Sequence, residues 1–128
     1  MVTNREPMTV ALQLLAAENA HDVHTAVSLF ADHAVVKPAM YTYTTRAEIK
    51  AWQQEMAGGN LVIRAGKLHA VGNTVRWNGQ IALDRFRQLG FQELDGSWEV
   101  VVEDGKIIAF TFSLSPTSLA RLQAVSSR

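Results

Sequence analysis

Apolar residues recur at helical spacing in the first third of the chain. Val10, Leu14 and Ala17 form one such stripe, which predicts a helix over about Pro7 to Ala20. The proline fits there because the first turn of a helix leaves its backbone N–H groups without intrahelical partners. A second stripe consists of Val23, Ala26, Val27 and Phe30. It predicts a helix over Asp22 to about Asp32, with the Asp22 side chain as N-cap.

The pattern then changes to a short extended piece and returns to helical spacing. Residues 34–37 include two valines and are closed by Pro38, so we expect a strand. Thr45 and Glu48 have the spacing of a capping box, in which two residues satisfy each other's backbone N–H groups. They begin a predicted helix that ends at Gly58-Gly59. Its inner face consists of Ile49, Trp52 and Met56.

The second half of the chain has the alternation of strands. Two hairpins are predicted, one at Gly72-Asn73 and one at Asp104-Gly105. Their strands are Leu61–Val71 with Thr74–Trp77, and Trp98–Glu103 with Lys106–Ser115. The second turn places Glu103 opposite Lys106, which makes a favourable cross-strand pair.

The segment between the hairpins, residues 81–96, has a mixed pattern. We expect DRFRQL to form one helical turn that Asp84 caps and Gly90 ends. The pair Asn78-Gly79 offers a competing hairpin. Beyond the last strand, Ser115-Pro116 has the pattern of an N-cap followed by a first-turn proline, and it predicts a short C-terminal helix.

Helices followed by a sheet predict an α+β fold, and 128 residues are most simply one domain, residues 1–128. Twelve basic and twelve acidic residues cancel, and no Lys/Arg block provides a footprint for nucleic acid. The absence of cysteine excludes disulfides and thiolate metal sites, and it fits a reducing compartment. We therefore expect a cytoplasmic protein that does not bind nucleic acid.

One apolar run near the start, Met8 to Ala17, has the length of a signal-peptide core. Gln13 interrupts this run and Glu18 follows it closely, so a first helix of the fold is the better interpretation. No stretch is long enough to span a membrane, and we expect no membrane partner.

Two segments carry a resemblance to a known family. HDVHTAVSLFADHAVVKP, residues 21–38, resembles the loop, helix and strand signature of NTF2-like proteins, in particular the SnoaL-like and ketosteroid-isomerase-like branch. The ending VVVEDGKIIAFTFSLSP, residues 100–116, is similar to SnoaL-like proteins of unassigned function. The resemblance implies a cystatin-like cone, in which N-terminal helices pack on a curved antiparallel or mixed sheet and enclose a pocket.

The sequence departs from the best-known enzymes that it resembles. Ketosteroid-isomerase-like enzymes carry a carboxylate base before the proline that follows the first strand, and a tyrosine on the first helix. Lys37 and Leu14 occupy these places here. A buried Lys37 could act as a base if desolvation lowered its pKa, although a solvated lysine is the simpler interpretation. Limonene-epoxide-hydrolase-like proteins use Arg-x-Asp along one strand, a motif that this sequence lacks.

Two carboxylates are candidates for acid–base chemistry. Asp84 could activate water beside Arg85 or Arg87, or it could simply cap the helical turn. Glu99 lies in a predicted strand, where strict alternation places it on the face opposite Trp98. If that face lines the pocket, burial raises the pKa of Glu99 and makes it an acid or base. On the outer face it would be a surface or dimer-interface residue.

Large side chains provide the candidates for ligand binding. Tyr41, Tyr43, Trp52 and Trp77 offer flat apolar surface with a polar edge, as pockets for polycyclic or terpenoid ligands do. Arg85 is the candidate for a polar contact to the same ligand. Plain core packing is the competing interpretation, above all for Trp52.

These features predict a protein that holds a small, largely apolar organic molecule in the cone pocket. A catalytic version would use acid–base chemistry for isomerisation, cyclisation, dehydration or hydrolysis. The alternative is a non-catalytic ligand-binding or dimerisation module of the same fold. His21 and His24 lack a metal-binding motif, so we expect no metal and no cofactor. Apolar residues on both faces of the last two strands predict a homodimer through the outer sheet face.

Overall fold

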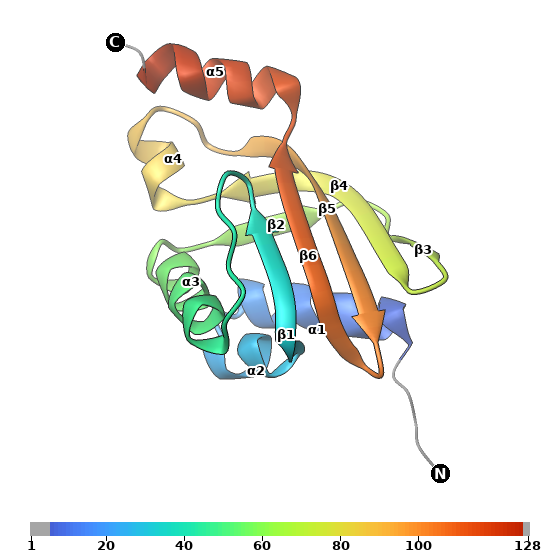
Figure 1. Cartoon of the computed structure of the whole chain (residues 1–128). Coiled ribbons are helices and arrows are strands. Elements are labelled where there is room, and N and C mark those ends of the chain that lie inside the picture. Colours follow the sequence, from blue (N-terminus) through green and yellow to red (C-terminus); the bar gives the residue numbers. More distant parts are fainter. Residues whose placement is uncertain (1–5, 127–128) are drawn as a thin grey trace.

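A computed structural model describes residues 6–126, and it contains a curved sheet with helix α1 lying across one face (Figure 1). The strand order is β1-β6-β5-β4-β2, and β3 pairs with the first residues of β4. The strands are β1 (Phe30–Pro38), β2 (Val62–Ala65), β3 (His69–Val71), β4 (Thr74–Ala82), β5 (Leu94–Glu103) and β6 (Lys106–Leu114). The helices are α1 (Pro7–Asn19), α2 (Val23–Ser28), α3 (Arg46–Gly58), α4 (Asp84–Gln88) and α5 (Pro116–Ser126). Since β1 and β6 are parallel and the other pairs antiparallel, the expected α+β arrangement on a mixed sheet is confirmed.

Local signals at the helix ends act as the sequence predicts. Asp22 accepts a hydrogen bond from the Thr25 backbone N–H at 3.2 Å and caps α2. The capping box at the start of α3 is present in both directions. Ser115 Oγ accepts from the Ser118 N–H at 3.1 Å in the first turn of α5. Each such cap stabilises its helix by about 1 kcal/mol relative to alanine.

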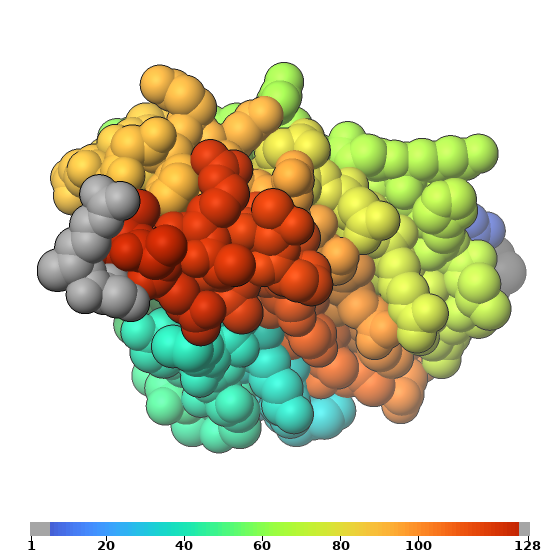
Figure 2. Space-filling view, turned by 90° about the horizontal axis from the view of Figure 1, so that it is seen from above, coloured from blue at the N-terminus to red at the C-terminus, as the bar shows by residue number. Residues whose placement is uncertain are grey.

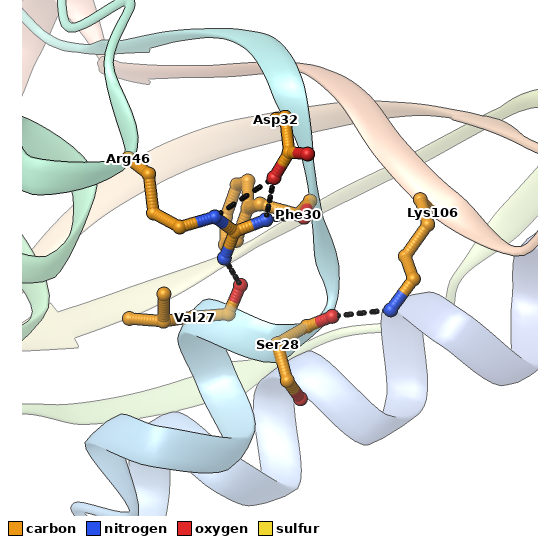
Figure 3. Close-up of polar contacts among 6 residues, drawn as sticks. All are labelled: Val27, Ser28, Phe30, Asp32, Arg46 and Lys106. Atoms are coloured by element: carbon orange, nitrogen blue, oxygen red, sulfur yellow. Dashed lines mark hydrogen bonds and ion pairs between the residues drawn. The ribbon is translucent and has the colours of Figure 1, made fainter.

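Helix α2 is shorter than its apolar stripe predicts, because tertiary contacts end it early. It ends at Ser28, and β1 already begins at Phe30 and pairs with β6. Arg46 of α3 holds this junction, since its guanidinium donates to the carbonyl oxygens of Val27 and Phe30 and to the carboxylate of Asp32 (Figure 3). Carbonyl groups at a helix end need such partners, so the contact favours the early start of the strand.

The strands of the second half differ from the prediction in their lengths. The predicted strand over residues 61–71 is two strands, β2 and β3, and β5 begins at Leu94. Asn78-Gly79 is not a turn but lies inside β4, which continues to Ala82. A Cβ atom at Gly79 would collide with the carbonyl oxygen of Arg64 on β2. The glycine therefore marks a close approach of two strands.

Both predicted hairpins are confirmed. Val71 pairs with Thr74 around Gly72-Asn73, and Glu103 pairs with Lys106 around Asp104-Gly105. The predicted helical turn is α4, but the residue at its N-cap is Leu83 rather than Asp84. Asp84 is the first helical residue, where its negative charge interacts favourably with the positive end of the helix dipole.

Alternation along the strands determines which side chains reach the interior. Val75 of β4 and Val100 of β5 are fully buried, and both strands contact α1. Val10 and Leu14 of α1 are equally inaccessible, so Leu14 is a core residue. Between residues 6 and 126, no helix is both long and apolar enough to cross a membrane.

Candidate functional site

A cavity of about 310 Å³ lies between the inner face of the sheet and the helices. Residues of α1, α3, α4, α5 and the turn after β1 contribute to its wall, together with strand residues. Figure 2 shows the molecule from the side on which α5 lies. In this view α5 lies beside α4 and beside the segment that follows β1. The volume falls within the range of small-molecule sites, roughly 300–1,000 Å³. The aromatic members of the wall are Tyr41, Tyr43, Trp52, Phe86, Trp98, Phe110 and Phe112.

The aromatic wall contains two groups of neighbouring rings. Trp52 meets Phe110 edge to face with centroids 5.1 Å apart, and it lies 6.4 Å from Tyr43. Trp98 and Phe112 form the second group, with centroids 4.7 Å apart. Rings packed in this way restrict one another's rotamers. The cavity is therefore preformed and apolar over most of its surface.

Two tyrosines enter the wall from the turn after β1. The backbone groups of Val36 and Tyr43 exchange two hydrogen bonds, of 2.9 and 2.8 Å, which fix the position of Tyr43. Tyr41 stacks on Tyr43 with centroids 6.2 Å apart and planes 6° apart. Tyr41 is 57% exposed, so it lies at the mouth of the cavity. Desolvation raises the pKa of the Tyr43 hydroxyl above its ordinary value.

One buried carboxylate lies in the cavity wall. Glu18 of α1 is 3% exposed, and its Oε2 accepts a hydrogen bond from Nε2 of Gln53 on α3 at 2.9 Å. Its Oε1 is buried without a hydrogen-bond partner among the described residues. Burial raises the pKa of Glu18 to about 7, against the opposing effect of the Gln53 hydrogen bond. A carboxyl with this pKa exchanges protons at neutral pH.

The other charged residues of the wall lie in solvent. Arg85 and Glu55 approach each other to 3.5 Å, and their side chains are 54% and 67% exposed. They form a weak ion pair at the mouth, because water and salt screen exposed charges. Glu18 is thus the buried ionisable side chain of this cavity.

Four of the five ligand-binding candidates line the cavity. These are Tyr41, Tyr43, Trp52 and Arg85. Trp77 is buried, but it stacks on Trp98 with centroids 6.0 Å apart and does not belong to the wall. The structure therefore makes Trp77 a packing residue behind the aromatic wall.

Glu99 lies on the opposite face of the sheet from the cavity. Its neighbour Trp98 points inward, whereas the side chain of Glu99 is 37% exposed and pairs with Arg76 at 2.8 Å. The prediction of Glu99 as a pocket acid or base is wrong for this reason. Alternation gave the correct partition of β5 into two faces, but it does not say which face the helices cover.

Asp84 and Lys37 also lie outside the cavity wall. Asp84 accepts hydrogen bonds from Arg87 and from Asn60, both at 2.8 Å, and these contacts hold the start of α4. Lys37 is exposed on β1 and lies opposite Thr111 of β6. The arrangement supports structural roles for both residues.

His21, which precedes α2, lies against a backbone carbonyl. His21 has a positive φ of 58°, and its Nε2 lies 2.9 Å from the carbonyl oxygen of Leu61. Within the described part of the chain, no three His, Asp or Glu side chains are grouped so as to hold a metal ion.

Sequence reasoning missed Glu18 and Gln53, although both lie on stripes that it identified. Glu18 falls four residues after Leu14 and so continues the apolar face of α1. Gln53 lies between Trp52 and Met56 on the inner face of α3. A polar residue on each of two facing apolar stripes is the signal that predicts a buried pair.

The sequence matches no family model and no curated protein. Its structure, however, is similar to that of an NTF2-like protein of unknown function from Cytophaga hutchinsonii. The TM-score is 0.74 at 16% identity, over 94% of this chain and 99% of that one. The chain has the NTF2-like fold.

Two further structures similar to this chain have different origins. One is the epoxide hydrolase/cyclase-like enzyme SalBIII, which has a role in pyran ring formation in the polyether salinomycin; its TM-score is 0.78 at 16% identity. The match covers 88% of this chain and 92% of SalBIII. A de novo designed protein with a curved β-sheet has a TM-score of 0.71 at 13% identity, over 98% of both chains. Since an enzyme and a designed protein are both similar to this chain in structure, function has to be argued from the cavity.

Proposed function

We propose that this protein holds a small, largely apolar organic molecule in its cavity and that Glu18 exchanges a proton with this molecule. The proposal rests on one observation, the buried carboxyl in a wall whose other buried side chains are apolar. With a pKa of about 7, Glu18 is present in both its protonated and its ionised form at neutral pH. It can therefore act as a general acid or as a general base.

The reaction class follows from what one such group can do. The carboxylate of Glu18 accepts a proton from a C–H or O–H group of the ligand, and the resulting acid returns it at another position of the same molecule. This is the proton transfer of an isomerisation or a cyclisation, and of a dehydration when the returned proton goes to the leaving hydroxyl. In a hydrolysis the carboxylate would instead take the proton from the attacking water and give it to the leaving group. The rings of Trp52 and Tyr43 would pack against the ligand, and Arg85 and Tyr41 would contact it at the mouth. The description of SalBIII as epoxide hydrolase/cyclase-like supports this class of chemistry by analogy.

Ligand occupancy is tested by filling the cavity. Leu122 of α5 lines the cavity and is half-buried, whereas Ala124 of the same helix is exposed and outside the wall. Protein expressed in cells is extracted with organic solvent, and the extract is analysed by mass spectrometry. We expect a co-purifying molecule in unaltered protein and in Ala124→Trp, and its loss in Leu122→Trp. Equal extracts from all three proteins would contradict a ligand in this cavity.

Proton exchange is tested on the extracted molecule. Incubation with the protein in D₂O should place deuterium on carbon, and Glu18→Gln should abolish this exchange at ligand concentrations that saturate the variant. A carbon-bound label that persists in Glu18→Gln would rule out Glu18 as the acid–base group.

A second candidate function is binding without catalysis. It is favoured by the single buried ionisable side chain in the described wall, because proton transfer between two positions is commonly divided between two groups. For this function, the expected result is a bound molecule that acquires no deuterium on carbon in the presence of either protein.

A further inference from the structure

We infer that the ligand of this cavity is an organic cation, such as a lipophilic protonated amine, whose charged nitrogen lies beside Glu18. This inference rests on the proposed function, since it names the class of molecule that the same cavity takes. Three features of the wall support it: its charge balance, its aromatic rings and the composition of its mouth.

The charges of the wall do not balance when Glu18 is ionised. The charged residues of the wall are Glu18, Glu55 and Arg85. Arg85 lies 3.5 Å from Glu55 at the exposed mouth, so these two opposite charges offset each other. One minus charge therefore remains, and it is the ionised form of Glu18 in the buried part of the wall.

The part of the chain that the structure describes forms no ion pair with this carboxylate. His21 and Asp22 line a narrow space on which Glu18 also borders, but His21 Nε2 contacts the Leu61 carbonyl oxygen and Asp22 caps α2. Among the described residues, Glu18 receives one hydrogen bond, from the neutral amide of Gln53, and its Oε1 receives none. Burial without a positive neighbour is also what raises the pKa of this group. Buried charges in proteins are ordinarily paired. A bound ammonium would provide both the opposite charge and an N–H donor.

The rings of the wall suit a cation as well as an apolar body. Trp52 and Trp98 both line the cavity, and the indole face is the strongest aromatic partner for a cation, at distances within about 6 Å of the ring centre. A neutral hydrocarbon would gain from the same rings only by burial. An ammonium gains from the rings and from the carboxylate together.

The mouth of the cavity favours a lipophilic body behind the charged nitrogen. Eight large apolar side chains are exposed among the described residues, and four of these line the cavity. The four are Met40, Tyr41, Leu89 and Leu119. An exposed apolar rim of this kind contacts the part of a ligand that extends out of a small cavity. The ligand thus enters with its nitrogen inward and its carbon skeleton along the rim.

A matched pair of probes tests the inference. 2-Phenylethylamine and 2-phenylethanol differ in the group that carries the charge, and their binding is measured by calorimetry at pH 8 and pH 6. We expect the amine to bind at least tenfold more tightly than the alcohol at pH 8. The affinity for the amine should fall about tenfold between pH 8 and pH 6, because a group with a pKa near 7 loses its negative charge over this interval. The affinity for the alcohol should not fall.

Two variants assign the preference to one carboxylate. Glu18→Gln should remove the preference for the amine together with its pH dependence, whereas Glu99→Gln, the matched change on the outer face of the sheet, should keep both. Equal binding of the two probes, or failure of both to bind at millimolar concentration, overturns the inference and leaves the proposed function intact, because that function is tested separately on the co-purifying molecule. A preference that persists in Glu18→Gln or disappears in Glu99→Gln also overturns the inference. If Glu18→Gln does not fold, the pH profile of the unaltered protein still decides.

Discussion

Gln53 of α3 donates a hydrogen bond to Glu18 of α1 across 2.9 Å, and both side chains are buried. The bond joins α1 to α3. Among the described residues of these two helices, it is the only side-chain hydrogen bond between two buried polar residues. It stabilises the ionised form of Glu18, but the loss of hydration outweighs it. The two residues therefore determine together how readily the cavity gains or loses a proton.

The raised pKa of Glu18 predicts that stability falls as the pH rises. Because the folded protein holds this proton up to about pH 7 and an unfolded carboxyl releases it near 4.5, the folded state binds more protons between these values. The stabilisation is complete below pH 4.5 and is lost by about pH 7, and it corresponds to about 3 kcal/mol. Glu18→Gln should remove this pH dependence from urea unfolding curves. Glu55→Gln, at the exposed mouth, should leave it unchanged.

Trp52→Ala should reduce both stability and ligand binding. Trp52 is 7% exposed, contacts Phe30 and Phe110, and also lines the cavity. Removing such a ring costs about 3–5 kcal/mol. Trp77→Ala is the matched control, because Trp77 is buried behind the wall and should cost a similar stability without a direct loss of ligand contact. Thermal melting and ligand titration measure the two effects, and equal binding by both variants would contradict a contact between Trp52 and the ligand.

Glu99→Gln should change little. The carboxylate pairs with Arg76 on the outer face at 2.8 Å, and both side chains are exposed to water. Exposed pairs contribute about 0–1 kcal/mol, so unfolding curves should shift by no more than that. Binding of a cavity ligand should be unaffected. A large loss of binding would place Glu99 back among the candidates for the site.

Arg46→Ala should destabilise the junction between α2 and β1. The guanidinium donates to two carbonyl oxygens and to Asp32, and a hydrogen bond from a charged donor contributes about 1.5–3 kcal/mol. We expect a loss of about 2 kcal/mol in unfolding free energy, with faster hydrogen exchange at residues 28–32. Lys50→Ala removes a positive charge from the same helix and serves as the control.

The homodimer through the outer sheet face stays a prediction. The structure limits the apolar surface that could form this interface to a small part of the face. Most of this face is polar, but Val35, Ala109 and Val101 lie in one row across three strands. Val101→Lys should therefore shift the protein to a monomer in sedimentation at micromolar concentration, since a charge in that row is costly to bury. Val71→Lys, at the exposed end of β3, should not. A monomeric unaltered protein would contradict the prediction.

Local features of the fold could be predicted from the sequence, whereas the choice of inner face could not. The capping box at Thr45 and the turn at Asp104-Gly105 depend on neighbours a few residues apart, so their patterns are sufficient. The position of Glu99 depends on which side of the sheet α1 covers. That choice involves residues about eighty positions away, and no alternation pattern contains it.

The candidate site shows the same division. Trp52 and Tyr43 could be predicted from their type and position, because a large ring near a strand end or on a helix stripe is rarely far from a core or cavity. The burial of Glu18 could not be predicted in this way, because glutamate side chains in most proteins are exposed to solvent. Its burial follows from the pairing of α1 with α3, and this pairing is a property of the packed structure.

The parallel pairing of β1 with β6 has a consequence for the order in which the protein can be made. Val36 lies beside Phe110, and Trp52 contacts the same phenylalanine, yet more than fifty residues separate either from it in the chain. During synthesis from the N-terminus, the backbone groups of β1 that pair with β6 have no partner strand until β6 has been made. The part of the cavity wall that Phe110 and Phe112 form is thus added only after β6 has left the ribosome.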